Sequence, residues 1–296
     1  MEQHSQPVAS AAQSDSPLAA FLAAGPGAVR EAPESLWGFG GLHGGLALAA
    51  MVDAAASTAQ SPHPLRSVTG RFHRPVRGPF TVEVSAESAT RSTSGFGARI
   101  VPAAAPTTGP AAGPTAVPAA GSTAAPALAS ATALFGAAGG SATPVLSPPA
   151  PAVPGWREGE LFRPPPTLVP VGALTEIRAL GPHRPFAGGA EPELTAWLRV
   201  AGDDAPPTEL HLLFLVDALA PSYAALLTAP TAIPTVELSV AFTGTAAVSP
   251  WVLIEARTTV ATRGGWISET IQVWGEDGTH LAEAKQLRLV RQAQAS

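Results

Sequence analysis

The chain has no cysteine among its 296 residues, which excludes disulfides, thiolate metal sites and a cysteine nucleophile. Charged residues make up only 13%, and the formal net charge is −5, so a basic surface for nucleic acid or anionic membrane is not expected. The seven histidines are scattered without metal-ligand spacing, and we expect no metal. With 46% apolar residues, the chain is long enough for one large domain or two small ones.

The sequence also lacks targeting and membrane signals. The N-terminus has no basic segment followed by a continuous apolar one, so no signal peptide is expected. No uninterrupted run of about 18 apolar residues is present, which predicts that nothing spans a membrane. We therefore expect a soluble, cytoplasmic protein.

Proline is abundant, with 32 residues, and its placement divides the chain. No charged residue occurs from Ile100 to Trp156, and proline recurs there at every fourth position from Pro102 to Pro118. Proline at this spacing forbids a helix, and few large apolar side chains are available to pack. We predict a disordered or polyproline-like insertion at 102–125, a Pro-rich linker at 136–170 and a disordered tail at 1–17.

Between these breaks the chain shows a weak internal duplication. Three sets of positions match: Phe72 with Phe242, Pro79–Phe80 with Pro250–Trp251, and Leu128–Ala131 with Leu281–Ala284. The offset falls from 170 in the first pair to 153 in the last, which places about 17 extra residues between Val101 and Ala127. Their counterpart is a tight turn at Gly275–Gly278. The Pro/Ala-rich insertion therefore lies at a hairpin tip, where insertions are tolerated.

Each half is predicted to contain one buried helix and several strands. The first helix spans 44–57 and is rich in alanine and apolar almost all round, which is typical of a buried helix; its counterpart is Leu210–Leu227. Alternating or β-branched segments predict strands at 67–75, 79–90, 95–101, 127–135, 174–180, 194–200, 235–243, 251–260, 265–274 and 280–290. A buried helix wrapped by a long antiparallel sheet, repeated in tandem, is the α+β double hotdog, with units at 18–135 and 171–296.

Three motifs in order carry a family resemblance: FGGLHGGLALAAM at 39–51, HPLRSVTGRFHRPV at 63–76 and DGTHLAEAKQLRLVR at 277–291. They resemble the type II acyl-CoA thioesterases of double-hotdog fold, over about 36–101, 127–135 and 174–291. The resemblance implies hydrolysis of a fatty or related acyl-CoA to free acid and coenzyme A, with no cofactor.

The resemblance also implies a catalytic trio. In the family an Asp on the second helix, a Thr that opens the next strand and a Gln on the last strand hold the attacking water; Asp217, Thr235 and Gln286 match them. These residue types suit the hydrolysis of a thioester, because Asp can accept a proton from the attacking water while Thr and Gln orient that water by hydrogen bonds. No Gly-x-Ser-x-Gly sequence occurs, so a covalent serine route lacks its signature.

The start of the first helix is the candidate substrate-binding element. Gly44 and Gly45 permit close approach to the helix N–H groups, which would hold the oxyanion, and the His43 imidazole would reach a substrate carbonyl. The alternative for His43 is a partly buried structural residue. Arg71, Arg74 and Arg77, with Arg288 and Arg291, are either solvated strand ends or contacts to the phosphates of coenzyme A. Trp251, Trp266 and Trp274 are interpreted as aromatic core.

Several readings remain open. Asp217 alone would suit a helix end before Pro221, and Asp53 is the competing acid by internal symmetry, although Leu65 and Ala133 leave it without polar partners. The sequence departs from the family at Glu237, Leu238 and Leu287. Two rival functions follow: a non-hydrolytic acyl-thioester or lipid-binding protein, and a hotdog hydratase or tailoring enzyme for carrier-bound acyl chains. Because hotdog sheets pair edge to edge, a homodimer is compatible with this fold.

Overall fold

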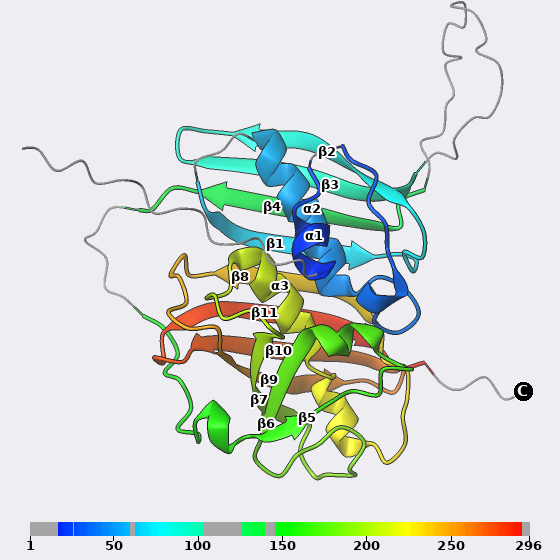
Figure 1. Ribbon diagram of the computed structural model, residues 1–296, viewed down its shortest axis with the longest axis vertical. Helices are drawn as coiled ribbons and strands as arrows, with labels where there is room; N and C mark the ends of the chain where they lie inside the picture. Colours follow the sequence, from blue (N-terminus) through cyan, green and yellow to red (C-terminus); the bar gives the residue numbers. More distant parts are fainter. Residues whose placement is uncertain (1–16, 26, 60–62, 104–125, 140–145, 292–296) are drawn as a thin grey trace, which may run out of the picture.

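Eleven strands form one antiparallel sheet, in the order β2-β3-β4-β1-β8-β11-β10-β9-β7-β6-β5, and the helices α1, α2 and α3 lie on one face of it (Figure 1). The structure is a computed structural model that describes residues 17–25, 27–59, 63–103, 126–139 and 146–291. Residues 1–16 of the predicted tail and nearly all of the predicted insertion, residues 104–125, lie outside these ranges, whereas Pro17 opens α1.

The elements have the following bounds. The helices are α1 (Pro17–Leu22), α2 (Gly44–Ala59) and α3 (Glu209–Ala218), with 3-10 turns η1 (Glu34–Leu36), η2 (Trp156–Glu158), η3 (Pro170–Leu174) and η4 (Ser222–Leu226). The strands of the first unit are β1 (Leu65–Phe72), β2 (Phe80–Ala89), β3 (Thr93–Pro102) and β4 (Ala129–Gly136). The remaining strands are β5 (Glu160–Phe162), β6 (Thr175–Leu180), β7 (Glu193–Val200), β8 (Thr235–Phe242), β9 (Val252–Ala261), β10 (Trp266–Gly275) and β11 (His280–Leu289).

The double-hotdog prediction is confirmed: each unit wraps a sheet around one central helix, and all ten predicted strands overlap observed ones. The second central helix is shorter than predicted. α3 ends at Ala218 and the 3-10 turn η4 follows, because Pro221 lacks an N–H and disfavours helical backbone at Ala220. The sequence analysis also missed the short edge strand β5.

The duplication is visible in the strand register. Phe72 pairs with Ala129 in the first unit, and Phe242 pairs with Ala282 in the second, which reproduces the offsets of 170 and 153. The units meet where β1 pairs antiparallel with β8, so the spatial order of one unit is the reverse of the other.

One element of the proposed alignment is wrong by a residue. β2 begins at Phe80 and β9 at Val252, and both side chains are fully buried in the main core. Trp251, the expected counterpart of Phe80, belongs instead to a separate cluster with Trp197 and Trp274. Since neighbouring strand residues point to opposite faces, a shift of one residue exchanges the two faces.

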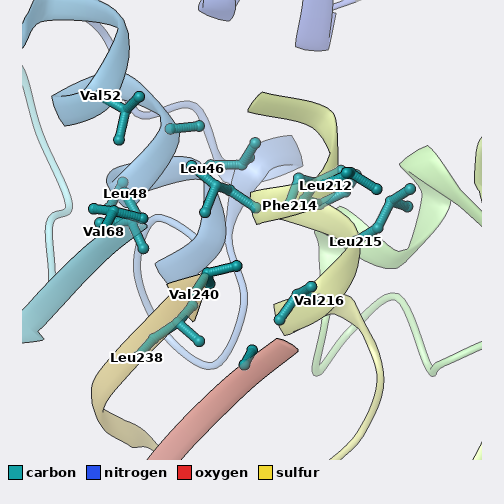
Figure 2. Packing of buried hydrophobic residues seen from close by; sticks show 14 of the residues in the cluster. Leu46, Leu48, Val52, Val68, Leu212, Phe214, Leu215, Val216, Leu238 and Val240 are labelled. Atoms are coloured by element: carbon teal, nitrogen blue, oxygen red, sulfur yellow. The ribbon is translucent and has the colours of Figure 1, made fainter. Parts of the chain in front are cut away.

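A single apolar core runs through both units. It joins the two central helices to the sheet, and Figure 2 shows side chains of α2, α3, β1 and β8 gathered in one cluster. The crossing of α2 and α3 is close: a Cβ on Gly45 would lie 2.3 Å from the Leu213 carbonyl oxygen and 3.0 Å from Phe214 Cα. Glycine at position 45 therefore sets the distance between the two helices.

The Pro-rich stretch that was expected to be a linker packs on the cluster of Trp197, Trp251 and Trp274. The Trp197 and Trp274 indoles donate to the carbonyls of Pro154 and Pro148, at 2.9 and 3.1 Å. Trp156 stacks on Trp251 with ring centroids 4.7 Å apart. Residues 146–156 thus cover the cluster, and the short strand β5 that follows pairs with β6.

One helical stretch, Glu209–Leu226, is long and apolar enough to cross a membrane by length and composition alone. This is weak support for a span, because the stretch contains α3 and η4, whose apolar side chains pack in the protein interior.

The helix crossing gives a stability prediction. Gly45→Ala should lower the free energy of unfolding by about 3 kcal/mol or more, because the new methyl group meets backbone that cannot move alone. Gly78→Ala is the matched control: its Cβ would meet nothing within 4 Å, and a change below about 0.5 kcal/mol is expected. Urea unfolding measures both; equal effects would show that the helices are free to separate.

Candidate active site

Asp217 lies in the last turn of α3, with only 6% of its side chain exposed, at the point where α3 meets the first turn of α2. A carboxylate is unfavourable at the C-terminal end of its own helix, but favourable beside the N-terminus of another. Gly45 N–H, in the first turn of α2, donates to Asp217 Oδ2 at 2.9 Å. The partial positive charge of α2 therefore stabilises this carboxylate.

The other end of α3 is fixed by a reciprocal capping box. Thr208 N–H donates to His211 Nδ1 at 3.3 Å, and His211 N–H donates to Thr208 Oγ1 at 3.5 Å. Burial lowers the pKa of His211, against the opposing attraction of Asp203, so Nδ1 stays an acceptor at neutral pH. This cap holds the start of the helix that carries Asp217.

The three predicted catalytic residues meet at one oxygen atom. Thr235 Oγ1 donates to Asp217 Oδ1 at 3.2 Å, and Gln286 Nε2 donates to the same atom at 2.7 Å. Thr235 opens β8 and Gln286 lies on the neighbouring strand β11, so the sheet register brings both to the end of α3.

His43 and Gly44 complete the contacts of the carboxylate. His43 Nε2 lies 3.0 Å from the backbone oxygen of Asp217 and 3.5 Å from its Oδ2. A Cβ on Gly44 would stand 2.7 Å from the same Oδ2, so any larger residue would displace the carboxylate. The structure thus brings His43, Gly44 and Gly45 against Asp217; the Gly45 N–H, expected to face the substrate, is bonded to Asp217.

Comparison with protein families identifies the family of this chain. Residues 33–136 match the acyl-CoA thioesterase N-terminal domain, and residues 144–290 match the acyl-CoA thioesterase C-terminal domain. The chain belongs to the acyl-CoA thioesterase family.

Solved structures share the fold of this acyl-CoA thioesterase family member. A conserved hot dog fold protein of unknown function from Alicyclobacillus acidocaldarius is 22% identical, with TM-score 0.74 over 90% of this chain and 93% of that one. The tesB protein of Mycobacterium avium subs paratuberculosis is 16% identical, with TM-score 0.64 over 93% and 98%. Acyl-CoA thioesterase II TesB2 of Mycobacterium marinum is 17% identical, with TM-score 0.61 over 85% and 90%. Comparison with curated proteins gave no match.

Two buried residues extend the contacts of the trio in a way that the sequence analysis did not predict: Arg288 and Glu269. Arg288, expected at a solvated strand end or on coenzyme A phosphates, is only 5% exposed. Its Nη1 donates to Thr235 Oγ1 at 2.9 Å and its Nη2 donates to Gln286 Oε1. Strand alternation was the available signal, since positions 286 and 288 share one face of β11.

Glu269 pairs with Arg288 from the adjacent strand β10. Its Oε2 accepts from Arg288 Nε at 2.9 Å and its Oε1 accepts from Ser222 N–H at 2.5 Å. Glu269 is 2% exposed, so the guanidinium and two carboxylates form a buried network in which each charge has partners.

Asp53, the competing acid, is not without partners as the sequence analysis expected. Its Oδ2 forms an ion pair with Arg30 Nη2 at 2.5 Å, and Arg30 Nη1 donates to the Phe21 carbonyl at 2.7 Å. By the observed register, Leu65, Ala133 and Phe135 stand where Thr235, Gln286 and Arg288 stand in the second unit. Asp53 therefore ties the N-terminal segment to α2, beside apolar residues.

The remaining candidates lie outside this network. Arg71 pairs with Glu237 at 2.7 Å on the surface, and Arg77 Nε donates to the Gly40 carbonyl at 2.5 Å. Trp251 and Trp274 are buried as predicted, but Trp266 is 41% exposed and the core interpretation is wrong for it. Within the described residues, no three His, Asp or Glu side chains gather as metal ligands.

The buried network gives a second stability prediction. Arg288→Met should destabilise the protein by about 3–5 kcal/mol, because Glu269 loses its counter-ion in a buried place. The double variant Arg288→Met/Glu269→Gln should lose clearly less than the sum of the single changes.

Lys285→Met, on the same strand, is the control. Lys285 is 69% exposed and lies 3.7 Å from Glu283, so its loss should cost less than about 1 kcal/mol. Additive effects of Arg288 and Glu269 in urea unfolding would contradict the coupling.

Proposed function

We propose that this chain is a cytoplasmic thioester hydrolase that cleaves a fatty or related acyl-CoA into free acid and coenzyme A. The observation that carries the proposal is the meeting of Thr235 and Gln286 on the Asp217 carboxylate. Membership of the acyl-CoA thioesterase family supports the reaction class. All of these residues come from one chain, so the activity does not require the homodimer that the fold would permit.

In this proposal a water molecule bound against Asp217, Thr235 and Gln286 attacks the thioester carbonyl. The carboxylate accepts the proton as the new C–O bond forms, and the negative charge moves to the carbonyl oxygen. Collapse of the tetrahedral intermediate breaks the C–S bond, and the proton passes from Asp217 to the leaving sulfur. Arg288 positions the trio, since it holds Thr235 Oγ1 and Gln286 Oε1 at once.

The oxyanion is assigned to the start of α2. The first N–H groups of a helix have no partner within it, and they favour negative charge. Gly44 opens this turn, and a Cβ on it would stand 2.7 Å from Oδ2 of Asp217, the carboxylate that holds the water in this proposal. His43, Gly44 and Gly45 then form the substrate-binding edge, preceded by a glycine-rich loop whose Phe39 is 55% exposed.

The departures from the family pattern lie beside the Asp217 contacts rather than among them. Glu237 pairs with Arg71 on the surface, Leu238 is fully buried in the apolar core, and Leu287 pairs with Glu237 in the sheet. The polar contacts of Asp217 are intact, which favours turnover over a protein that only binds acyl thioesters.

Thiol release from a panel of acyl-CoA chain lengths tests the function. Asp217→Asn should lower kcat by about 10²–10⁴-fold, because the amide cannot accept the proton of the water. A thiol-reactive dye is suitable, since the protein has no cysteine to react with it.

Asp53→Asn is the symmetry-matched control, and it should retain hydrolysis. If the folded wild type releases no thiol from any chain length but binds acyl-CoA, the chain is a binding protein. Water addition to an enoyl-CoA without thiol release would instead identify a hydratase.

A further inference from the structure

His43 Nδ1 is the one buried side-chain nitrogen or oxygen without a hydrogen-bond partner in the part of the chain that the structure describes. The residue is 6% exposed, and its ring packs edge-on against Phe214, with centroids 5.3 Å apart. A buried polar atom without a partner is costly, and in native proteins it indicates water or a ligand.

The other ring nitrogen fixes the chemistry of this atom. His43 Nε2 faces the backbone oxygen of Asp217 at 3.0 Å, and a carbonyl oxygen only accepts. Nε2 therefore carries the proton, and the Asp217 carboxylate at 3.5 Å favours the same arrangement. In the neutral imidazole Nδ1 is then a pure acceptor.

An acceptor cannot bind the thioester carbonyl, so the sequence-based expectation that His43 reaches that carbonyl does not fit this tautomer. The partner must be a donor close to the reacting carbon. In a coenzyme A thioester, the nearest such group is the pantetheine amide N–H, two carbon atoms from the sulfur. The same arm occurs on acyl carrier proteins.

The position of Nδ1 suits this group. Gly38 lies against the Cδ2 edge of the ring, 3.5 Å from where its Cβ would be, and Nδ1 is on the opposite edge. The ring stands at the start of α2, with its Nε2 next to the carboxylate assigned to the water. If the thioester carbon lies beside Asp217, the amide N–H of the same substrate lies about the width of one imidazole ring from that carbon. Nδ1 is the ring nitrogen farther from Asp217, and therefore lies on the side where this amide would be.

We propose that His43 Nδ1 accepts a hydrogen bond from the pantetheine amide N–H nearest the sulfur. The inference rests on the proposed function, since it takes the reacting carbon to lie at Asp217. His43 is then a substrate-recognition residue for the phosphopantetheine arm, whichever carrier presents it.

The test removes the donor from the substrate and leaves the protein unchanged. An acyl-N-acetylcysteamine thioester keeps this amide, and the acyl thioester of 2-mercaptoethyl acetate has an ester oxygen in place of the N–H. The wild type should prefer the amide about tenfold in kcat/KM, because the ester leaves Nδ1 unpaired. Equal rates would overturn the proposal.

Two variants separate the ring nitrogens. His43→Asn keeps an acceptor near the Nδ1 position and should retain the preference for the amide. His43→Gln keeps a donor near the Nε2 position and should lose it. The preference is a ratio, so a general loss of rate does not move it, and thermal unfolding verifies folding. A preference retained in His43→Gln would contradict the assignment, as would a loss of kcat equal for both thioesters.

Two further arms complete the design. His43→Gln should lower kcat/KM by the same factor for acyl-CoA and for acyl-carrier protein, and the wild-type ratio identifies the carrier; a loss confined to one carrier would refute the amide contact. If no thioester is hydrolysed, the proposed function fails on its own. Calorimetric binding of the amide and ester compounds then decides: tighter binding of the amide supports the His43 contact, and equal binding overturns it.

Discussion

The hydrogen bond from Gly45 N–H to the Asp217 carboxylate depends on the close crossing of α2 and α3, and the rest of the site depends on that bond. The crossing requires glycine at position 45, since any Cβ would meet the backbone of α3. It places the carboxylate at the C-terminal end of α3 beside the positive N-terminal end of α2, which stabilises the buried charge. Thr235, Gln286 and His43 then need only short side chains to reach it.

The two units share a fold and a register but not a chemistry. In the second unit Thr235, Gln286 and Arg288 carry polar groups to the end of α3, and Glu269 balances the guanidinium. The equivalent positions of the first unit are leucine, alanine and phenylalanine, and Asp53 is neutralised by Arg30 from outside the sheet. The duplicated fold therefore accepts polar residues around Asp217 in one unit and apolar residues around Asp53 in the other. Strand pairing uses the backbone and leaves the side chains free to vary.

In the proline-rich stretch, composition predicts the absence of helix, but the residues it packs against decide whether it is ordered. Its frequent proline excludes an α-helix, and between residues 146 and 169 the described chain forms only the 3-10 turn η2 and the short strand β5. Composition alone suggested a linker, but the buried indoles of Trp197 and Trp274 donate hydrogen bonds to it, and the buried ring of Trp251 stacks on its Trp156. A segment that cannot pack on itself can still be ordered by a partner surface, and here that surface includes Trp251, 95 residues from Trp156, and Trp274, 126 residues from Pro148.

The sequence by itself determined the repeated helix-and-sheet pattern and the positions of ten strands, because periodicity survives without knowledge of contacts. Asp217, Thr235 and Gln286 came from the family resemblance of its motifs, and the structure brings these three side chains together. Pro221 was a signal in the sequence for the end of α3, but no signal fixed the one-residue shift that separates Phe80 from Trp251 or the burial of Arg288 and Glu269. Those depend on which strands become neighbours and which face each side chain takes. Only the tertiary structure brings β10, β11 and both helices together, and therefore only it decides which charges are paired and which His43 nitrogen is left without a partner.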